Sequence, residues 1–205
     1  MTRHARPSRC QAVQPWLYLS LALSLVLPGC AVAPLVKVRE PVRMGSFEVS
    51  SPIEWSQFGI NRMRTWTLDG PDLNHLMFYV DIKDREHVFL QLPTARQRRK
   101  GEGALYRAGI SESEAVELIA DGLSAYGLVT PKIEKVSPAQ FGAQSGFSFE
   151  LSFATERGLR YQAIGIGEIQ QNTLSYALYY APSEYYFTRN KADVEAVFRS
   201  IRSVE

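Results

Sequence analysis

Alternating apolar and polar residues dominate the second half of the chain. Phe147, Phe149, Leu151 and Phe153 occupy every second position, which is the period of a strand with one buried face. Comparable segments lie before and after this one, separated by short turns. We therefore predict an antiparallel meander of four strands: Lys132 to Val136, Gly146 to Thr155, Leu159 to Ile169 and Leu174 to Ala181.

Shorter β-rich segments occupy the first half. Residues 43–51 fit an edge strand that Pro52 ends. Residues 63–68 and the segment from Leu73 to Val80 flank the turn sequence at 69–71, so they are predicted to form a long hairpin. Trp55 and Phe58 lie between the edge strand and the hairpin, and we expect both side chains to enter the core.

Two segments have the helical period instead. Ser111 and Glu114 have the spacing of a capping box, in which each side chain satisfies the other residue's amide. Apolar residues then repeat at helical spacing up to the stop signal Tyr126-Gly127, namely Val116, Ile119, Ala120 and Leu123. A second amphipathic helix is predicted near the end, with Asn190 as its cap and an apolar stripe of Val194, Val197, Phe198 and Ile201.

This element order predicts the fold class. Strands, a helix, a run of four strands and a second helix indicate an α+β domain. We expect one domain over residues 44–205, an antiparallel β-sheet of about six or seven strands covered by two amphipathic helices. The length is sufficient for one hydrophobic core without disulfides.

The first residues have a different pattern. Arg3, Arg6 and Arg9 precede an uncharged run of twelve residues from Trp16 to Leu27, which is typical of a secretory signal. A helix that spans a membrane needs about 20 apolar residues. The run is therefore predicted to direct export and not to remain as an anchor.

The junction that follows, Leu27-Pro28-Gly29-Cys30, resembles the lipobox of bacterial lipoproteins. The resemblance implies that residues 1–29 are a lipoprotein signal peptide and that Cys30 receives diacylglycerol as the new N-terminus. Pro28 departs from the small residue usual in that family, and an ordinary signal peptide is the alternative. Ala31 is not the Asp that marks inner-membrane retention, so in a Gram-negative cell the resemblance implies the outer membrane, facing the periplasm.

Charge and cysteine content narrow the function classes. The first 29 residues contain three arginines and no acidic residue, so the rest has 20 basic and 21 acidic residues and a net charge of −1. This balance argues against nucleic acid as a partner. Cys10 would leave with the signal and Cys30 would carry lipid, so neither a disulfide nor a cysteine metal site is expected.

Two polar segments are predicted to lie outside regular structure. Residues 30–43 have two prolines and alternating charge, as expected of a lipidated cysteine followed by a tether. Residues 91–110 break both periods and are predicted to be a long exposed loop. Its basic residues could contact anionic lipid headgroups, with simple solvated charge as the alternative; they are Arg96, Arg98, Arg99 and Lys100.

Tyrosines gather near the last predicted strand and helix. Tyr176 and Tyr180 share one face of that strand and Tyr179 lies on the other, so one subset belongs to the core. An exposed subset would mark a partner site. The candidate partner or membrane face consists of Tyr179, Tyr185 and Tyr186 together with the basic residues at 96–100.

Catalytic and metal sites are not predicted. The only histidines after the signal, His75 and His87, lie near a few acidic residues, which is the pattern of a polar hairpin end. A G-x-S-x-G elbow does not occur, and no helix follows Gly165-x-Gly167 as a phosphate site would require. Strand glycines usually make room for a neighbouring ring. We expect no cofactor and no enzyme activity.

Several sequence pieces carry a further resemblance: WTLDG at 66–70, LNHLMFYVDI at 73–82, PAQFGAQSGFSFEL at 138–151, ALYYAPSEYYF at 177–187 and VEAVFRSIR at 194–202. They resemble a family of uncharacterised proteobacterial lipoproteins, and their order is similar to that of PsbP-like domains over residues 44–203. The resemblance implies an α/β/α sandwich with an accessory or assembly role. It provides no catalytic residue to carry over.

These observations lead to one hypothesis and one alternative. The hypothesis is a lipid-anchored cell-envelope protein, a non-catalytic accessory or binding domain attached to the membrane through its N-terminal lipid and acting on an envelope protein partner. The alternative is a periplasmic carrier or sensor of a small or lipidic ligand. Such a ligand would occupy an apolar cavity between sheet and helix.

Overall fold

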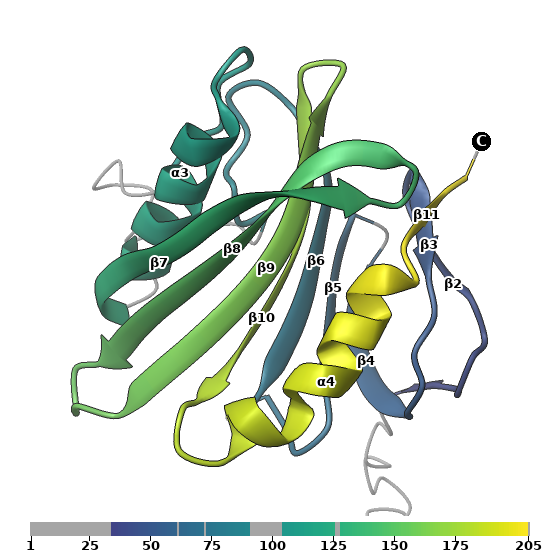
Figure 1. Cartoon of the computed structure of the whole chain (residues 1–205), viewed down its shortest axis with the longest axis vertical. Helices are drawn as coiled ribbons and strands as arrows, with labels where there is room; N and C mark the ends of the chain where they lie inside the picture. Colours follow the sequence, from purple (N-terminus) through teal and green to yellow (C-terminus); the bar gives the residue numbers. More distant parts are fainter. Residues whose placement is uncertain (1–33, 61, 72, 91–103, 126–127, 205) are drawn as a thin grey trace, which may run out of the picture. The chain divides into compact units, whose positions relative to one another are not determined.

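The largest element is an antiparallel sheet whose strands are β1 (Leu35–Val36), β4 (Trp55–Ile60), β5 (Met63–Thr67), β6 (His75–Ile82), β7 (Leu128–Phe141), β8 (Gln144–Thr155), β9 (Arg160–Gln170) and β10 (Thr173–Pro182). Their order is β1-β4-β5-β6-β10-β9-β8-β7, and Figure 1 labels each of these strands except β1. This computed structural model describes residues 34–60, 62–71, 73–90, 104–125 and 128–204, which lie within one compact unit.

A second sheet has three strands in the order β11-β3-β2, with β2 (Val42–Met44), β3 (Phe47–Val49) and β11 (Arg202–Ser203). The prediction of a single edge strand over 43–51 was wrong, because the chain turns back at Gly45, whose φ is +55°. Glycine adopts this left-handed conformation without steric cost. The turn buries both Met44 and Phe47.

Two helices, α3 (Glu112–Ala125) and α4 (Tyr186–Arg199), lie on opposite faces of the large sheet. The predicted capping box is present at α3: the Glu114 N–H donates to Ser111 Oγ at 3.3 Å, and the Ser111 N–H donates to Glu114 Oε2 at 2.8 Å. The α+β class with an antiparallel sheet and two helices is therefore confirmed. The large sheet alone has eight strands.

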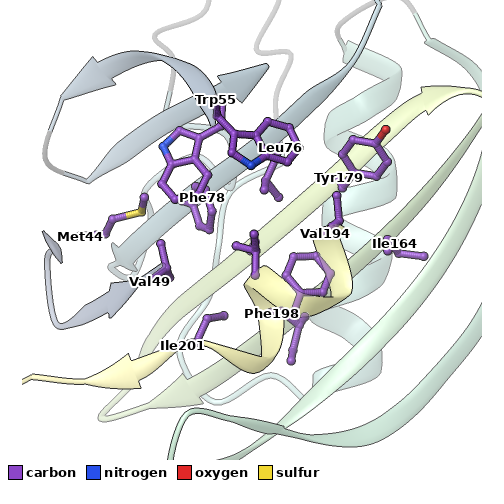
Figure 2. Close-up of a cluster of buried hydrophobic side chains, with 14 of the residues drawn as sticks. Met44, Val49, Trp55, Leu76, Phe78, Ile164, Tyr179, Val194, Phe198 and Ile201 are labelled. Carbon is purple, nitrogen blue, oxygen red and sulfur yellow. The ribbon is translucent and has the colours of Figure 1, made fainter. Parts of the chain in front are cut away.

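Strand alternation divides the interior into two hydrophobic clusters. On β6, Phe78 belongs to the cluster that includes residues of α4 and the small sheet, whereas Tyr79 belongs to the cluster that includes residues of α3. Figure 2 shows the first cluster. Within this cluster, the ring of Trp66 lies edge-on to Phe78 with centroids 4.9 Å apart and beside Trp55 at 6.3 Å. All eight apolar positions of the two predicted helix stripes are buried.

Other predictions need correction. Asn190 does not cap a helix: α4 begins at Tyr186, and Asn190 is a buried residue inside it. Phe58 is 44% exposed and is not a core residue. The segment predicted as a tether contains β1, whose Val36 pairs with Trp55 and is buried. Within the described ranges, no helix is long and apolar enough to cross a membrane.

Candidate functional site

An apolar pocket of about 420 Å³ opens on the face of the large sheet that carries α3. Three neighbouring strands form its floor. Phe58 on β4 pairs with Thr65 on β5, and Thr65 pairs with Met77 on β6, so these three side chains lie in one row. The described residues that line the pocket are Phe58, Thr65, Pro71, His75, Met77, Tyr79, Phe89, Leu123, Leu128 and Tyr180.

The position of α3 explains why the pocket exists. This helix packs chiefly against β7 and β8 at one side of the sheet. The same face over β4, β5 and β6 is therefore left without helix α3, and Leu123 and Leu128 form the wall at the boundary. The opposite face over these strands is filled by Trp55 and Trp66.

A hydrogen bond from the sheet fixes another wall. The Tyr176 hydroxyl donates to the Val88 carbonyl at 2.7 Å, and the Val88 N–H donates to the Ala104 carbonyl at 3.0 Å. Both contacts hold the backbone beside Phe89, whose ring lies edge-on to Tyr79 at 5.3 Å. The wall is thus tied to buried groups and is preformed.

The lining is chemically suited to an apolar ligand with few polar atoms. His75 stacks on Tyr180 with centroids 4.7 Å apart, and the Tyr79 hydroxyl donates to Met77 Sδ at 3.3 Å. Among the ten lining residues that the structure describes there is no carboxylate, lysine or arginine. Apolar surface with a few hydrogen-bonding groups is the usual character of small-molecule sites.

Tyr179, predicted to belong to an exposed face, is instead fully buried. Its hydroxyl donates to the Tyr186 carbonyl at 3.2 Å and accepts a hydrogen bond from Asn190 Nδ2 at 3.2 Å. Burial raises the pKa of Tyr179 to about 12. Tyr179 cannot form part of an exposed partner surface, because it lies on the face of β10 that α4 covers.

Tyr185 and Tyr186 do lie together at the start of α4. Tyr185 is 59% exposed, and the two rings meet edge-on at 5.1 Å. The Arg189 guanidinium lies over both rings, at 5.1 and 5.2 Å from their centroids, and forms an ion pair with Asp69. We call these four residues the tyrosine–arginine cluster.

The remaining predicted site residues lie outside the described residues: Cys30, Arg96, Arg98, Arg99 and Lys100. Of the two histidines considered as ligands, His75 lines the pocket, and His87 forms an isolated bridge with Leu105. The described ranges contain no group of three or more His, Cys, Asp or Glu residues that could hold a metal.

The sequence patterns did not identify Glu168, a buried acidic residue, as a candidate. Glu168 on β9 is only 9% exposed, and its Oε2 has no hydrogen-bond partner among the described residues. Burial, and secondly the negative charge of Asp81, raises the pKa of Glu168 to about 7. A periodic strand pattern contains no signal for such an environment, since Glu168 occupies an inward position between apolar neighbours.

Comparison with protein-family models and with curated proteins gives no match. Among solved structures, cyanobacterial PsbP (CyanoP) from Synechocystis sp. PCC 6803 matches with a TM-score of 0.50 at 10% identity, over 87% of this chain and 97% of that one. This similarity supports a PsbP-like fold.

Two weaker structural similarities accompany it. LpqN, involved in cell envelope biogenesis of Mycobacterium tuberculosis, gives a TM-score of 0.43 at 12% identity over 81% of this chain and 90% of that one. The Ran-binding protein Mog1p of Saccharomyces cerevisiae gives a TM-score of 0.47 at 9% identity, over 81% of this chain and 95% of that one.

Proposed function

We propose that this chain is a lipid-anchored, non-catalytic domain of the cell envelope that binds a small apolar ligand in the pocket beside α3. The observation that carries the proposal is the pocket itself, which has about 420 Å³ of space. The described residues that line it contain no acidic or basic side chain except His75. A site for covalent or acid–base chemistry needs several titratable groups that converge. The described part of the lining offers the His75 imidazole and the Tyr79 and Tyr180 phenols, without a carboxylate, lysine or arginine beside them.

The pocket favours the ligand carrier, the alternative from the sequence, over a domain that acts only on a protein partner. A ligand carrier was expected to have an apolar cavity between sheet and helix, and the pocket lies between the strands β4 to β6 and Leu123 of α3. Its volume is in the lower part of the range typical of small-molecule sites, roughly 300–1,000 Å³. The ligand is therefore expected to be a compact apolar molecule or one short acyl chain.

The anchor is supported by the sequence at Cys30. Two or more acyl chains on one cysteine give stable membrane attachment, whereas one chain gives only marginal binding. Metabolic labelling with an alkyne-bearing palmitate, followed by gel analysis, tests this part. The wild-type protein should be labelled and Cys30→Ala should not; equal absence of label from both would disprove the anchor.

Binding to the pocket can be tested with dansyl-labelled undecanoic acid and the Cys30→Ala form exported through an ordinary signal. Dansyl fluorescence should rise on binding. Thr65→Phe places a ring in the pocket from its floor and should weaken binding roughly tenfold or more, a loss of at least about 1.4 kcal/mol. Leu159→Phe is the matched control, because Leu159 is exposed and lies outside the lining.

Two results would contradict the proposal. The first is a Cys30→Ala form, with an unchanged pocket, that binds no dansyl fatty acid and releases no lipid on extraction. The second is Thr65→Phe with the same affinity as Leu159→Phe. Far-ultraviolet circular dichroism of both variants establishes that the domain is folded before the affinities are compared.

A protein partner is the second candidate function, favoured by the exposed ring of Tyr185. The tyrosine–arginine cluster holds this ring in place, and rigid aromatic side chains are common at binding hot spots. In-cell crosslinking of wild type, Cys30→Ala and Tyr185→Ala tests it. A specific envelope protein lost from Tyr185→Ala alone would support this candidate; the same recovery from wild type and Tyr185→Ala would exclude the cluster.

A further inference from the structure

The edge of the large sheet next to the pocket exposes apolar side chains. Leu35 on β1 is 57% exposed, and Phe58 on β4 is 44% exposed. Leu35 pairs with Ser56, so Phe58, two residues further along, is its diagonal neighbour on the same face. Phe58 also lines the pocket. One exposed apolar strip thus runs from the sheet edge to the pocket.

The same edge lies close in sequence to the predicted lipid. Leu35 is five residues after Cys30. Five residues span at most about 18 Å even when fully extended, so a lipid on Cys30 would hold β1 near the bilayer. Val38, 47% exposed, lies in the same stretch. Lys37 and Arg39 are there as well, together with Glu40, which forms an ion pair with Lys37 at 3.5 Å. The stretch therefore has a net charge of +1, and basic residues are attracted to anionic headgroups.

We propose that the β1–β4 edge rests on the lipid surface and that the pocket opens there, so that its ligand is an acyl-chain lipid taken directly from the bilayer. This inference rests on the proposed function, because it requires both the anchor and the pocket. It adds the source of the ligand and the side of entry. The exposed strip from Leu35 to Phe58 would provide an apolar path from the bilayer to the pocket.

An added strand from a protein partner is a poorer occupant of this edge. β1 has only two residues, so it offers few free backbone groups for a new ladder, and short edge strands discourage such pairing. Exposed apolar side chains beside a tethering point fit a membrane interface better, since an interface accepts side chains without requiring backbone partners.

The orientation can be tested on the full lipidated chain. After signal removal its one cysteine carries lipid, so Leu35→Cys and Val38→Cys each provide a single labelling site for a nitrobenzoxadiazole probe. The protein is reconstituted in phosphatidylethanolamine–phosphatidylglycerol vesicles that contain a doxyl-labelled quencher lipid. Ala143→Cys is the control, in the exposed turn between β7 and β8, the two strands at the opposite edge of the large sheet from β1.

Probes at Leu35 and Val38 should be quenched several times more strongly than the probe at Ala143. Equal quenching at all three positions, or stronger quenching at Ala143, would overturn the inference. This result does not depend on ligand binding. An edge that is quenched as expected in a protein that binds no dansyl fatty acid would refute the proposed function and, with it, the entry route.

Ligand entry is tested by the rate at which dansyl-labelled undecanoic acid moves from these vesicles to the protein. Leu35→Glu places a charge on the strip without changing the pocket lining, so transfer should slow several-fold while the affinity measured without vesicles stays the same. Ala143→Glu should change neither value. An unchanged transfer rate in Leu35→Glu would show that the ligand does not enter along this edge.

Discussion

The ring of Phe149 covers the backbone of Gly165, its partner across β8 and β9. A Cβ atom at Gly165 would lie only 2.1 Å from Phe149 Cζ. Phe149 is 1% exposed and packs under α3. The glycine therefore provides the space for a core ring, as the sequence predicted for Gly165, and a phosphate cradle is not needed to explain it.

Gly165→Ala should destabilise the domain by about 1–3 kcal/mol, the usual cost of forcing extra volume into a packed core. Urea unfolding followed by circular dichroism measures the change. Because the steric conflict involves one ring, Gly165→Ala combined with Phe149→Leu should cost less than the sum of the two single changes. Strict additivity of the two variants would show that the ring is not the obstacle.

Tyr179→Phe tests the polar contacts beneath α4. Removing the hydroxyl leaves Asn190 Nδ2 without the acceptor that it has at 3.2 Å, and an unsatisfied buried donor costs about 1–3 kcal/mol. Thermal unfolding should show the loss. Adding Asn190→Leu removes the orphaned donor as well, so the double variant should lose less than the two single variants together. Wild-type stability in Tyr179→Phe would contradict the role given to this bond.

Ser111→Ala should destabilise α3 by about 1 kcal/mol, a typical value for the loss of an N-cap side chain. The reason is that the Glu114 N–H loses Ser111 Oγ as its acceptor. Ser113→Ala is a suitable control, since Ser113 is also exposed but lies inside the first turn. Chemical denaturation of both variants gives the comparison. A larger effect at Ser113 would rule out the capping interpretation.

The helices and the meander were predictable because their signals are local. The capping box and the apolar stripe of α3 lie within 14 residues, and each meander strand pairs with the next one in sequence. The small sheet was not predictable in this way. Ser50 and Ser200 hydrogen-bond to each other across 150 residues, and no periodicity within either segment indicates the other.

The candidate site also depends on contacts between distant segments, which local sequence patterns do not predict. Alternation places Thr65 and Met77 on one face, but it cannot show that α3 packs over β7 and β8 and not over β5 and β6. For the tyrosines, parity correctly separated Tyr179 from Tyr176. It could not decide which side was exposed, because α3 and α4 cover both faces of β10.

The buried carboxyl group of Glu168 makes the stability of the domain depend on pH. Its pKa of about 7 in the folded protein is higher than the ordinary value of about 4.3 expected in the unfolded chain. Between these two values the folded state binds more protons than the unfolded state, so stability falls as the pH rises. The contribution is largest below about pH 4 and is lost as the pH passes through about 7.

Glu168→Gln keeps the shape of the side chain and removes its titration. The wild-type domain should lose up to about 3 kcal/mol from this one group between pH 4 and pH 8, whereas the variant should lack that decline and be the more stable of the two at pH 8. Urea midpoints at several pH values measure both. The variant Asp81→Asn provides a matched control: because the Asp81 charge is the second cause of the shift, it should reduce the pH dependence without abolishing it. Parallel pH profiles for the wild type and Glu168→Gln would mean that Glu168 is ionised at the same pH in the folded and unfolded states.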